Sequence, residues 1–334
     1  MSLWLNSLCL LFCVVLYSSA ASVPSIKLND GNQMPAIALG TWLGIVNDIF
    51  KNSQPNKNET EQAVLWALDA GYRHIDTAFV YGVENQVGRA LTKKFAEGMK
   101  REDVYITSKL WNDAHARDAV VPALRRSLEN LNLEYLDMYL IHFPFAYFAN
   151  GTIDTTDYVE TWRGMMEAKE LGLTKSIGLS NFNKEQIARV LELTPEKPAV
   201  VQIEVNLNLQ EPDLLSYCKE QDIAVMGYTP FGSLFSKAAS SDMSLTKVDD
   251  PALVEIAQKY NKTVPQVTLR YLVELGVIPL PKSVSKSRIE ENLQVFDFEL
   301  TSSERDLLKS YDRNHRTLLS VFWLDHPYFP FEKN

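Results

Sequence analysis

The feature that most constrains the fold is a repeated alternation of short apolar segments and longer amphipathic segments along most of the chain. The apolar segments have the composition of buried strands and lie at residues 36–39, 73–77, 104–109, 136–142, 176–180, 200–205, 223–228 and 277–280. Segments with helical apolar spacing lie at residues 60–70, 85–97, 117–130, 158–171, 184–193, 211–221, 251–260 and 265–275. Strands without a polar and apolar alternation are buried on both faces, as parallel strands are.

Alternation of this length favours a closed (β/α)8 TIM barrel, an α/β fold, over an open doubly wound sheet. The open sheet predicts a Gly-x-Gly-x-x-Gly turn after an early strand, and the sequence has none. Segments 25–28 and 33–39 flank an Asn-Asp-Gly turn, which predicts an N-terminal β-hairpin. No linker rich in Pro, Gly or Ser divides the chain. We therefore predict one domain over residues 22–334, with a long C-terminal loop at 312–334.

Helix boundaries follow from local chemistry. Gly71 ends the first predicted helix, because glycine adopts the left-handed conformation that closes a helix. Three later helices are predicted to begin with a capping box, a polar residue three positions before Glu or Gln. These boxes are Asn183 with Gln186, Ser287 with Glu290, and Thr301 with Glu304.

The first 21 residues differ from the rest of the chain. Residues 3–17 are strongly apolar, small residues follow at 18–21, and no charged side chain occurs among them. The run is shorter than the roughly 20 residues that a membrane span requires. We predict a secretory signal peptide over 1–21, cleaved after Ala20 or Ala21, with an uncleaved membrane anchor as the alternative. The expected product is secreted or held in the secretory pathway, with no membrane association after cleavage.

Two further features agree with this route. Cleavage removes Cys9 and Cys13, which leaves Cys218 alone and no internal disulfide. Triplets of the form Asn-x-Thr predict a glycoprotein with glycans at Asn58, Asn150 and Asn261.

Net charge limits the partners. The chain has 33 basic and 42 acidic residues, a formal charge of −9, which disfavours nucleic acid and anionic membranes as partners. No metal-ligand motif stands out, and no partner helix or sheet edge marks an interface. We expect a monomer that acts on a small molecule.

The candidate chemistry lies where the predicted strands end, because barrels of this kind place their active sites at the carboxyl ends of the strands. Asp76 ends the second strand and Tyr81 follows it, while Lys109 and His142 end the third and fourth. Each residue alone is more often a solvated charge, a structural histidine or a packed phenol. Because all four are expected at the same end of one barrel, we favour a catalytic role for them over these structural ones.

These four side chains suit proton transfer to a carbonyl. A phenol with a pKa near 10 is a weak acid at neutral pH, and a nearby ammonium is expected to lower that pKa. A carboxylate beside Lys109 would keep the ammonium charged and in place. A neutral His142 can orient a carbonyl oxygen next to Tyr81. The set is therefore predicted to protonate a carbonyl oxygen as hydride reaches the carbon.

The sequence resembles the aldo-keto reductase superfamily over nearly the whole chain after residue 21. The resemblance rests on the order and spacing of LGTW at 39–42, GYRHIDTA at 71–78 with Tyr81, ITSKLW at 106–111, SIGLSNF at 176–182 and IPLPKS at 278–283. It implies a catalytic tetrad of Asp76, Tyr81, Lys109 and His142, with Tyr81 as the proton donor. It also implies NADPH-dependent reduction of an aldehyde or ketone to the alcohol.

The resemblance further implies that NADPH binds without a Rossmann domain. The implied contacts are Ser180, Asn181 and Gln202 with the carboxamide, Tyr228 stacked on the nicotinamide, Thr41 and Trp42 at the mouth, Lys282, Ser283 and Arg288 with the 2′-phosphate, and Glu291 and Asn292 near adenine. Lys282, Lys286 and Arg288 also cluster at a predicted helix N-terminus, where an anion is favoured. We therefore predict NADPH over NADH.

Aromatic residues are predicted to wall the substrate pocket, which suits an apolar aldehyde or ketone. They are Trp42, Trp111, Phe143 and Trp323. A signal peptide on this scaffold resembles the secreted insect reductases that act on 3-dehydroecdysone at its 3-keto group, so steroid metabolism is an expected setting.

Two other functions were weighed against the reductase. A non-catalytic NADPH-binding or structural protein is opposed by the complete tetrad. An aldolase-type barrel with a Schiff base on Lys109 is opposed by Tyr81, by Asp76 and by the dinucleotide-like set at Ser283 and Arg288.

Overall fold

A computed structural model of the chain describes residues 23–44, 58–148, 150–235 and 245–332. The predicted signal peptide at 1–21 lies outside these residues. Eight strands form one parallel sheet in the order β3-β4-β5-β6-β9-β10-β11-β12. Their bounds are β3 (Leu39–Gly40), β4 (His74–Asp76), β5 (Tyr105–Leu110), β6 (Leu136–Ile141), β9 (Thr174–Ser180), β10 (Val200–Glu204), β11 (Ala224–Tyr228) and β12 (Val277–Pro279).

The first and last strands of this sheet meet and close it into a barrel. A parallel bridge joins Gly40 to Lys282. The N–H of Ala38 donates to the carbonyl of Pro279 at 3.2 Å, and the N–H of Gly40 donates to that of Pro281 at 3.1 Å. The predicted (β/α)8 TIM barrel is confirmed.

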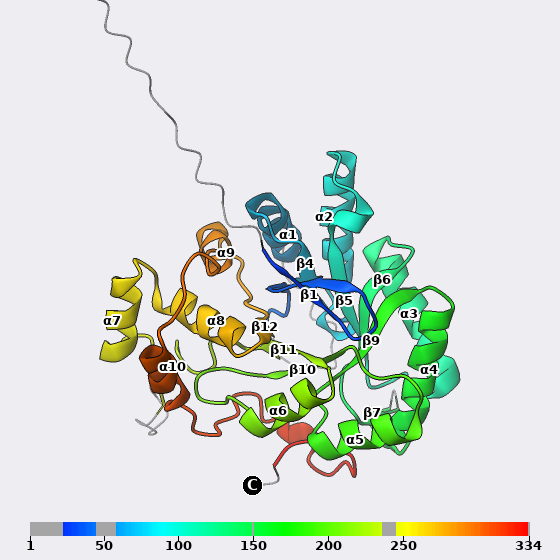
Figure 1. The fold of residues 1–334 in the computed structure, drawn as a ribbon. Helices are drawn as coiled ribbons and strands as arrows, with labels where there is room; N and C mark the ends of the chain where they lie inside the picture. Colours follow the sequence, from blue (N-terminus) through cyan, green and yellow to red (C-terminus); the bar gives the residue numbers. More distant parts are fainter. Residues whose placement is uncertain (1–22, 45–57, 149, 236–244, 333–334) are drawn as a thin grey trace, which may run out of the picture.

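Helices surround the strands, as Figure 1 shows. Their bounds in the described ranges are α1 (Glu59–Ala70), α2 (Glu84–Ala96), α3 (Arg117–Leu131), α4 (Tyr158–Glu170), α5 (Lys184–Leu193), α6 (Pro212–Glu220), α7 (Pro251–Lys259), α8 (Val264–Glu274), α9 (Lys286–Leu293) and α10 (Ser302–Lys309). Their apolar faces pack on the outer faces of the strands in one large core cluster, in which Trp162 and Tyr72 are fully buried.

Most helix ends follow the predicted chemistry. Gly71 closes α1 with φ 111°, a left-handed conformation that suits glycine. The capping boxes that begin with Asn183 and Thr301 are confirmed at the starts of α5 and α10. The box predicted at Ser287 is wrong. Helix α9 begins one residue before it, because the carbonyl of Ser285 accepts the first helical hydrogen bond, from the N–H of Ile289 at 3.0 Å.

A hairpin closes the amino-terminal end of the barrel. Strands β1 (Ser25–Lys27) and β2 (Gln33–Pro35) pair in an antiparallel register, and Figure 1 shows the hairpin lying in front of the barrel strands. The second arm predicted at 33–39 is split, because β2 ends at Pro35 and the chain then enters the barrel as β3. Leu28 and Met34 of the hairpin pack on Met138 and Met226 inside the barrel. The hairpin therefore fills the bottom of the barrel and leaves the opposite end for a site.

The connection from β6 to α4 contains a second hairpin that was not predicted. Its strands are β7 (Ala146–Tyr147) and β8 (Ile153–Asp154). Short 3₁₀ turns occur as η1 (Phe79–Tyr81), η2 (Arg101–Asp103) and η3 (Val321–Trp323). The C-terminal tail, residues 313–332, contains η3 and reaches the β7–β8 hairpin, where His326 Nε2 lies 3.1 Å from the carbonyl of Asp154.

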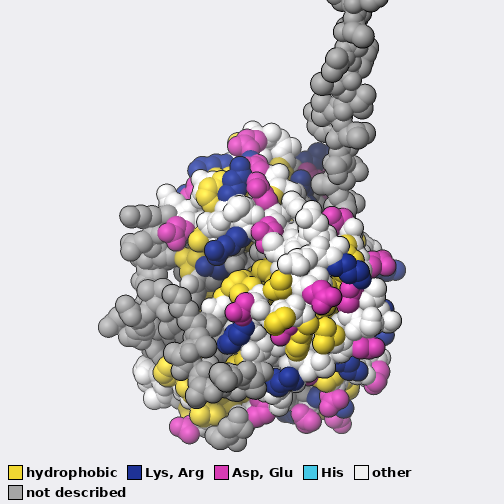
Figure 2. Space-filling view, turned by 90° about the vertical axis from the view of Figure 1, so that its left-hand side faces the viewer, with side chains coloured by type: hydrophobic (Ala, Val, Ile, Leu, Met, Phe, Trp, Pro, Cys, Tyr) yellow, Lys and Arg dark blue, Asp and Glu magenta, His cyan; other side chains and the backbone are white. Residues whose placement is uncertain are grey.

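The surface carries mixed charges on the face formed by α7, α8, α9 and α10. Figure 2 shows Lys and Arg side chains interspersed with Asp and Glu across this face. In the described part of the chain, no helix is long and apolar enough to cross a membrane.

Candidate active site

The four predicted tetrad residues come together at the carboxyl end of the barrel. Asp76 is the last residue of β4, and Tyr81 ends η1 directly after it. Lys109 lies near the end of β5, and His142 follows the last residue of β6. Parallel strands of a barrel end on the same side, so neighbouring strand ends place these side chains side by side.

Lys109 is the centre of the cluster. Its side chain is fully buried, and its ammonium donates to Asp76 Oδ1 at 2.7 Å and to the carbonyl of Thr77 at 2.9 Å. The same ammonium lies 3.5 Å from the hydroxyl of Tyr81. The second oxygen of Asp76, Oδ2, accepts from Gln202 Nε2 at 2.8 Å. The carboxylate therefore has a donor on each oxygen, which fixes both it and the lysine.

Tyr81 and His142 face each other beside this pair. Their ring centroids lie 5.7 Å apart at 78°, an edge-to-face contact. Trp111 packs on the imidazole of His142 with ring centroids 5.2 Å apart. The phenol of Tyr81 and the imidazole of His142 therefore lie close enough for both to contact the same carbonyl oxygen.

The surroundings set the protonation states. Burial lowers the pKa of His142 well below its ordinary value, and the Lys109 charge acts in the same direction. The imidazole is therefore neutral at physiological pH, as the proposed orienting role requires. Burial also lowers the pKa of Lys109, and the adjacent Asp76 carboxylate opposes that shift.

The expected lowering of the Tyr81 pKa by Lys109 is wrong. Burial raises the pKa of Tyr81 well above its ordinary value, and the charges of Asp76 and Tyr228 act in the same direction. The physical reason is the burial of the phenol, which the ammonium of Lys109, paired with Asp76 at 2.7 Å, does not outweigh. Tyr81 is accordingly an undissociated phenol, able to donate its proton.

A second buried carboxylate supports the cluster and was not predicted. Glu84, in the first turn of α2, accepts from Ser108 Oγ at 2.6 Å and from Asn130 Nδ2 at 3.0 Å. Burial raises the pKa of Glu84. Because Ser108 directly precedes Lys109 on β5, this hydrogen bond ties α2 to the strand that carries the lysine. The only sequence signal for this residue was its position three residues after Tyr81. That spacing does not reveal that its partner, Ser108, lies on β5.

The residues expected near the nicotinamide lie on the adjoining strands. Ser180 and Gln202 lie on β9 and β10, and Asn181 follows β9 with φ 61°. Asn181 Nδ2 donates to the carbonyl of His142 at 2.9 Å, and its Oδ1 accepts from the hydroxyl of Tyr228 at 2.6 Å. One hydroxyl and two amides form a donor and acceptor set that fits a carboxamide.

Two residues expected at the mouth lie on the opposite side of the tetrad. Thr41 follows β3 and donates its hydroxyl to the carbonyl of Asp76 at 3.0 Å. The ring centroid of Trp42 lies 6.4 Å from that of Tyr81. Trp42 therefore borders the phenol, and Thr41 is held to the backbone of Asp76.

The residues expected near the 2′-phosphate follow β12. Lys282 and Ser283 lie between β12 and α9, and Arg288 is exposed on α9. An ammonium, a hydroxyl and a guanidinium fit a phosphate monoester. Asn292 is buried on the same helix, while the carboxylate of Glu291 accepts from Thr263 Oγ1 at 2.7 Å. Glu291 is therefore already engaged in holding α8 to α9.

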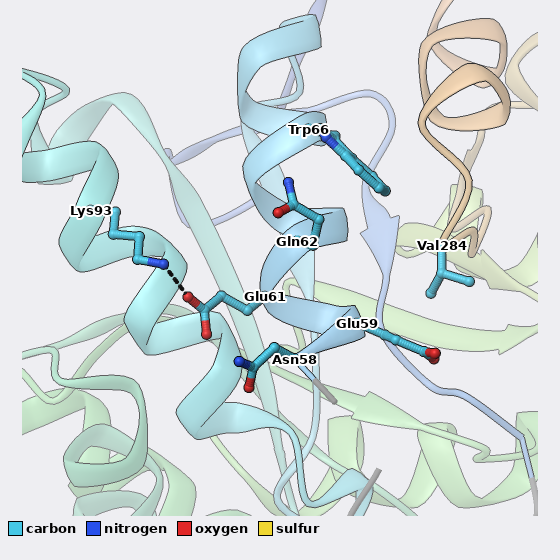
Figure 3. A pocket seen from close by; sticks show the side chains of 7 residues that line it. All are labelled: Asn58, Glu59, Glu61, Gln62, Trp66, Lys93 and Val284. Atoms are coloured by element: carbon cyan, nitrogen blue, oxygen red, sulfur yellow. Dashed lines mark hydrogen bonds and ion pairs between the residues drawn. The ribbon is translucent and has the colours of Figure 1, made fainter. Parts of the chain in front are cut away.

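A surface cavity of about 440 Å³ borders this segment. Figure 3 shows Glu59 of α1 and Val284 extending toward the same space, and an ion pair joins Lys93 to Glu61. Partial burial lowers the pKa of Lys282, and the Glu59 carboxylate opposes the shift. A second cavity, of about 540 Å³, lies between α5, α6 and the C-terminal tail. Neither contains a tetrad residue, so we place the chemistry by the convergence of acid, lysine, phenol and imidazole.

Three of the four predicted wall residues form one aromatic cluster. Trp323 of the C-terminal tail lies 5.1 Å from Phe143 and 6.0 Å from Trp111 between ring centroids. Phe145, which was not predicted, lies 4.9 Å from Phe143 and joins the same cluster. Trp42 lies apart from it, beside Tyr81.

The three predicted glycosylation sites are all on the surface. Asn58, Asn150 and Asn261 have exposed side chains. Asn58 precedes α1, Asn150 lies between β7 and β8, and Asn261 lies between α7 and α8.

Comparison with known sequences gives matches over most of the chain. The family described as "Aldo/keto reductase family" matches residues 36–313. The aldo-keto reductase AKR2E4 of Bombyx mori is 47% identical over 313 residues, which cover 93% of this chain and 99% of that protein. The aldo-keto reductase family 1 member A1-A of Danio rerio is 42% identical over 329 residues, covering 92% and 98%.

Solved structures agree in fold. The crystal structure of Bombyx mori AKR2E4 in complex with NADP has a TM-score of 0.87 at 45% identity, and covers 93% of this chain and 100% of that chain. The structure of silkworm AKR2E5 complexed with NADPH has a TM-score of 0.89 at 41% identity, covering 93% and 94%.

Proposed function

This chain belongs to the aldo/keto reductase family, and on that premise we propose that its tetrad reduces an aldehyde or ketone with Tyr81 as the proton donor. The enzyme is an NADP-dependent oxidoreductase, and NADPH is its cofactor. One observation carries the assignment of roles. The Lys109 ammonium touches both the Asp76 carboxylate, at 2.7 Å, and the Tyr81 hydroxyl, at 3.5 Å.

Each residue of the tetrad has a separate role in the proposed reduction. Tyr81 donates a proton to the carbonyl oxygen, and Lys109 stabilises the negative charge that forms on the phenol oxygen. Asp76 holds the ammonium in place. His142, kept neutral by burial, orients the carbonyl oxygen toward Tyr81.

When bound, NADPH supplies the hydride that reaches the carbonyl carbon. The residues proposed to hold it are Ser180, Asn181 and Gln202 at the carboxamide, Tyr228 at the nicotinamide ring, Thr41 and Trp42 at the mouth, Lys282, Ser283 and Arg288 at the 2′-phosphate, and Glu291 and Asn292 near adenine. Lys282 and Arg288 would discriminate against NADH, because NADH lacks the 2′-phosphate that these two cations are proposed to bind. Equal efficiency with NADH would count against that role for Lys282 and Arg288.

An apolar carbonyl compound is the proposed substrate class. Trp111, Phe143 and Trp323 offer a continuous aromatic surface next to His142, and Trp42 borders Tyr81. Such a surface favours a large apolar ketone over a polar one. A steroid ketone such as 3-dehydroecdysone, reduced at its 3-keto group, is the specific candidate.

The test is NADPH oxidation with a panel of aldehydes and keto-steroids, comparing the wild type with Tyr81→Phe. The substitution keeps the ring and removes the proton, so we expect kcat to fall by about 10²- to 10⁴-fold. Tyr135→Phe is the control, because Tyr135 lies near the amino-terminal end of the barrel, where its hydroxyl accepts from Lys175.

The outcomes separate the alternatives. No turnover by the wild type, with NADPH still bound, would favour a non-catalytic binding protein. Turnover that survives Tyr81→Phe unchanged would remove Tyr81 as the acid. Reductive trapping of a substrate on Lys109 would indicate the aldolase-type chemistry.

We also propose that residues 1–21 direct the chain into the secretory pathway, that Asn58, Asn150 and Asn261 carry glycans there, and that the product is a monomer. The exposed position of the three asparagines supports the second part. Amino-terminal sequencing of protein collected from the medium of expressing cells tests the first, and an intact Met1 would contradict it.

A further inference from the structure

Strand β10 and the turn after it carry a row of buried polar side chains at every second position. These are Gln202, Glu204, Asn206, Asn208 and Gln210, and each is at most 4% exposed. Gln202 serves the tetrad through its hydrogen bond to Asp76. Glu204, two residues further along the strand and in register with Tyr228, makes no hydrogen bond to a tetrad residue in the described part of the chain.

Glu204 holds the backbone of the C-terminal tail. Its side chain is 0% exposed. The N–H of Thr317 donates to Oε1 at 2.8 Å, and the N–H of Leu318 donates to Oε2 at 3.0 Å. Asn206 Nδ2 donates to Oε1 at 3.1 Å. A buried carboxylate must be hydrogen-bonded to persist, so these donors and Glu204 fix each other's positions.

The tail is held again on both sides of this point. Before it, the carbonyl of Asn208 accepts from the N–H groups of Arg313 and His315 at 3.1 and 2.9 Å. After it, Gln186 Nε2 donates to the carbonyl of Tyr328 at 2.9 Å. Contacts at 313–318 and at 328 therefore enclose the segment that includes η3.

The enclosed segment presents apolar side chains outward and one aromatic inward. Leu319, Val321 and Phe322 are 52%, 50% and 71% exposed. Trp323, directly after them, is 7% exposed and packs on Phe143. Their positions depend on where the chain leaves Leu318, because only four residues separate that hydrogen bond from the indole.

We propose that Glu204 is a positioning residue that fixes Thr317 and Leu318 and thereby places Trp323 against Phe143 and Trp111 in the wall of the substrate site. This inference rests on the proposed reductase function and deepens it. Glu204 governs the fit of large apolar ketones and leaves the proton transfer at Tyr81 untouched. Strand β10 thus supports the tetrad through the hydrogen bond from Gln202 to Asp76, and it influences which substrate sizes fit through Glu204.

The experiment is Glu204→Gln in the full chain. Glutamine has nearly the same shape, but its NH₂ group would face one of the two tail N–H donors, so one hydrogen bond is lost and two donors oppose each other. Steady-state kinetics are measured with a polycyclic ketone and with a short aliphatic aldehyde. We expect KM for the ketone to rise about tenfold, and both kcat for the aldehyde and Kd for NADPH to stay within twofold. Amide hydrogen exchange at Thr317 and Leu318 should become faster.

Glu304→Gln is the matched control. Glu304 also accepts from a backbone N–H, that of Thr301 at 2.7 Å, but it lies on α10 and not on the tail. We expect no change in KM for either substrate. Should Glu204→Gln fail to fold, Glu204→Asp keeps the charge on a side chain one methylene shorter, and an intermediate rise in KM is expected.

The results separate the inference from the proposed function. An equal change in KM for the ketone and the aldehyde, or an unchanged KM for the ketone despite faster exchange at Thr317 and Leu318, would overturn the inference. Unchanged exchange at these amides would overturn it as well. Failure of the wild type to reduce either substrate would instead overturn the proposed function.

Discussion

Lys109 is fully buried, and burial acts on its ammonium against the charge that the proposed mechanism requires. The carboxylate of Asp76, at 2.7 Å, is the larger opposing influence, and the charge of Glu84 acts in the same direction. The tetrad therefore includes a buried charge that is favoured chiefly by one neighbour. This dependence makes the protonation state of the site sensitive to a single substitution.

Asp76→Asn tests that dependence. Without the carboxylate, burial lowers the pKa of Lys109 further, because only the charge of Glu84 still opposes it, and loss of the same charge lowers the raised pKa of Tyr81. Both groups then lose their protons at lower pH. We expect kcat to fall by about 10²-fold or more, and the alkaline limb of the pH profile of kcat/KM to move to lower pH.

Asp137→Asn is the control for this substitution. Asp137 is also a buried carboxylate in two ion pairs, with Arg101 at 2.7 Å and Lys175 at 3.0 Å, but it lies at the start of β6, away from the tetrad. It should lower the free energy of unfolding and leave the alkaline limb in place. An alkaline limb that stays fixed in Asp76→Asn would show that Asp76 does not maintain these protonation states.

Two helices begin with the same capping box and differ in what else the box contacts. In α10, Thr301 accepts from the N–H of Glu304, and Glu304 accepts from the N–H of Thr301. In α5, Asn183 and Gln186 form the same exchange. Asn183 also donates to the carbonyl of Pro330 at 3.2 Å, so this helix start holds the tail as well.

Asn183→Ala and Thr301→Ala are a matched pair of substitutions that test these two helix starts. Each removes an N-cap side chain, and each should lower the free energy of unfolding by about 1 kcal/mol. Urea denaturation followed by circular dichroism measures this change. Only Asn183→Ala should also speed amide exchange in residues 328–332. Equal exchange in the two variants would mean that Asn183 does not hold the tail.

The elements could be predicted from sequence to the extent that their signals are local. Buried parallel strands are short and apolar, and a polar residue at the end of such a strand stands out, so Asp76, Lys109 and His142 could be placed at one end of a barrel. The cap at Ser285 was missed because Ser287, with Glu290 three residues later, has the capping-box pattern, whereas Ser285 is followed at that distance by Arg288 and makes no side-chain cap.

The whole-molecule contacts could not be predicted, because they join positions more than a hundred residues apart. Glu204 lies 113 residues from Thr317, and nothing at either position indicates the other. The raised pKa of Tyr81 is likewise chiefly a result of burial by the assembled barrel, with the charges of Asp76 and Tyr228 acting in the same direction. Packing of distant segments therefore decides both the tail and the protonation of the site.

Four of the five histidines are buried in the assembled molecule, and this predicts its stability at acid pH. Burial lowers the pKa of His74 and of His115 to about 3, and lowers those of His142 and His326 as well. The unfolded chain has histidines with a pKa near 6.5, so below that pH it binds more protons than the folded chain. Stability is therefore fully present above about pH 6.5 and is lost as the pH falls, by up to about 1.4 kcal/mol per pH unit for each such histidine.

His115→Leu isolates one of these contributions. The leucine removes a proton-binding group from the unfolded state, so the slope of unfolding free energy against pH, measured by urea denaturation between pH 4 and 5.5, should decrease by about 1.4 kcal/mol per unit. Asn112→Leu is the control, because Asn112 is buried nearby in sequence and its side-chain amide makes no hydrogen bond with the described residues. It does not titrate, so it should shift the stability by the same amount at every pH. An unchanged slope in His115→Leu would mean that His115 is already protonated in the folded protein at these pH values, in conflict with its burial at 1% exposure.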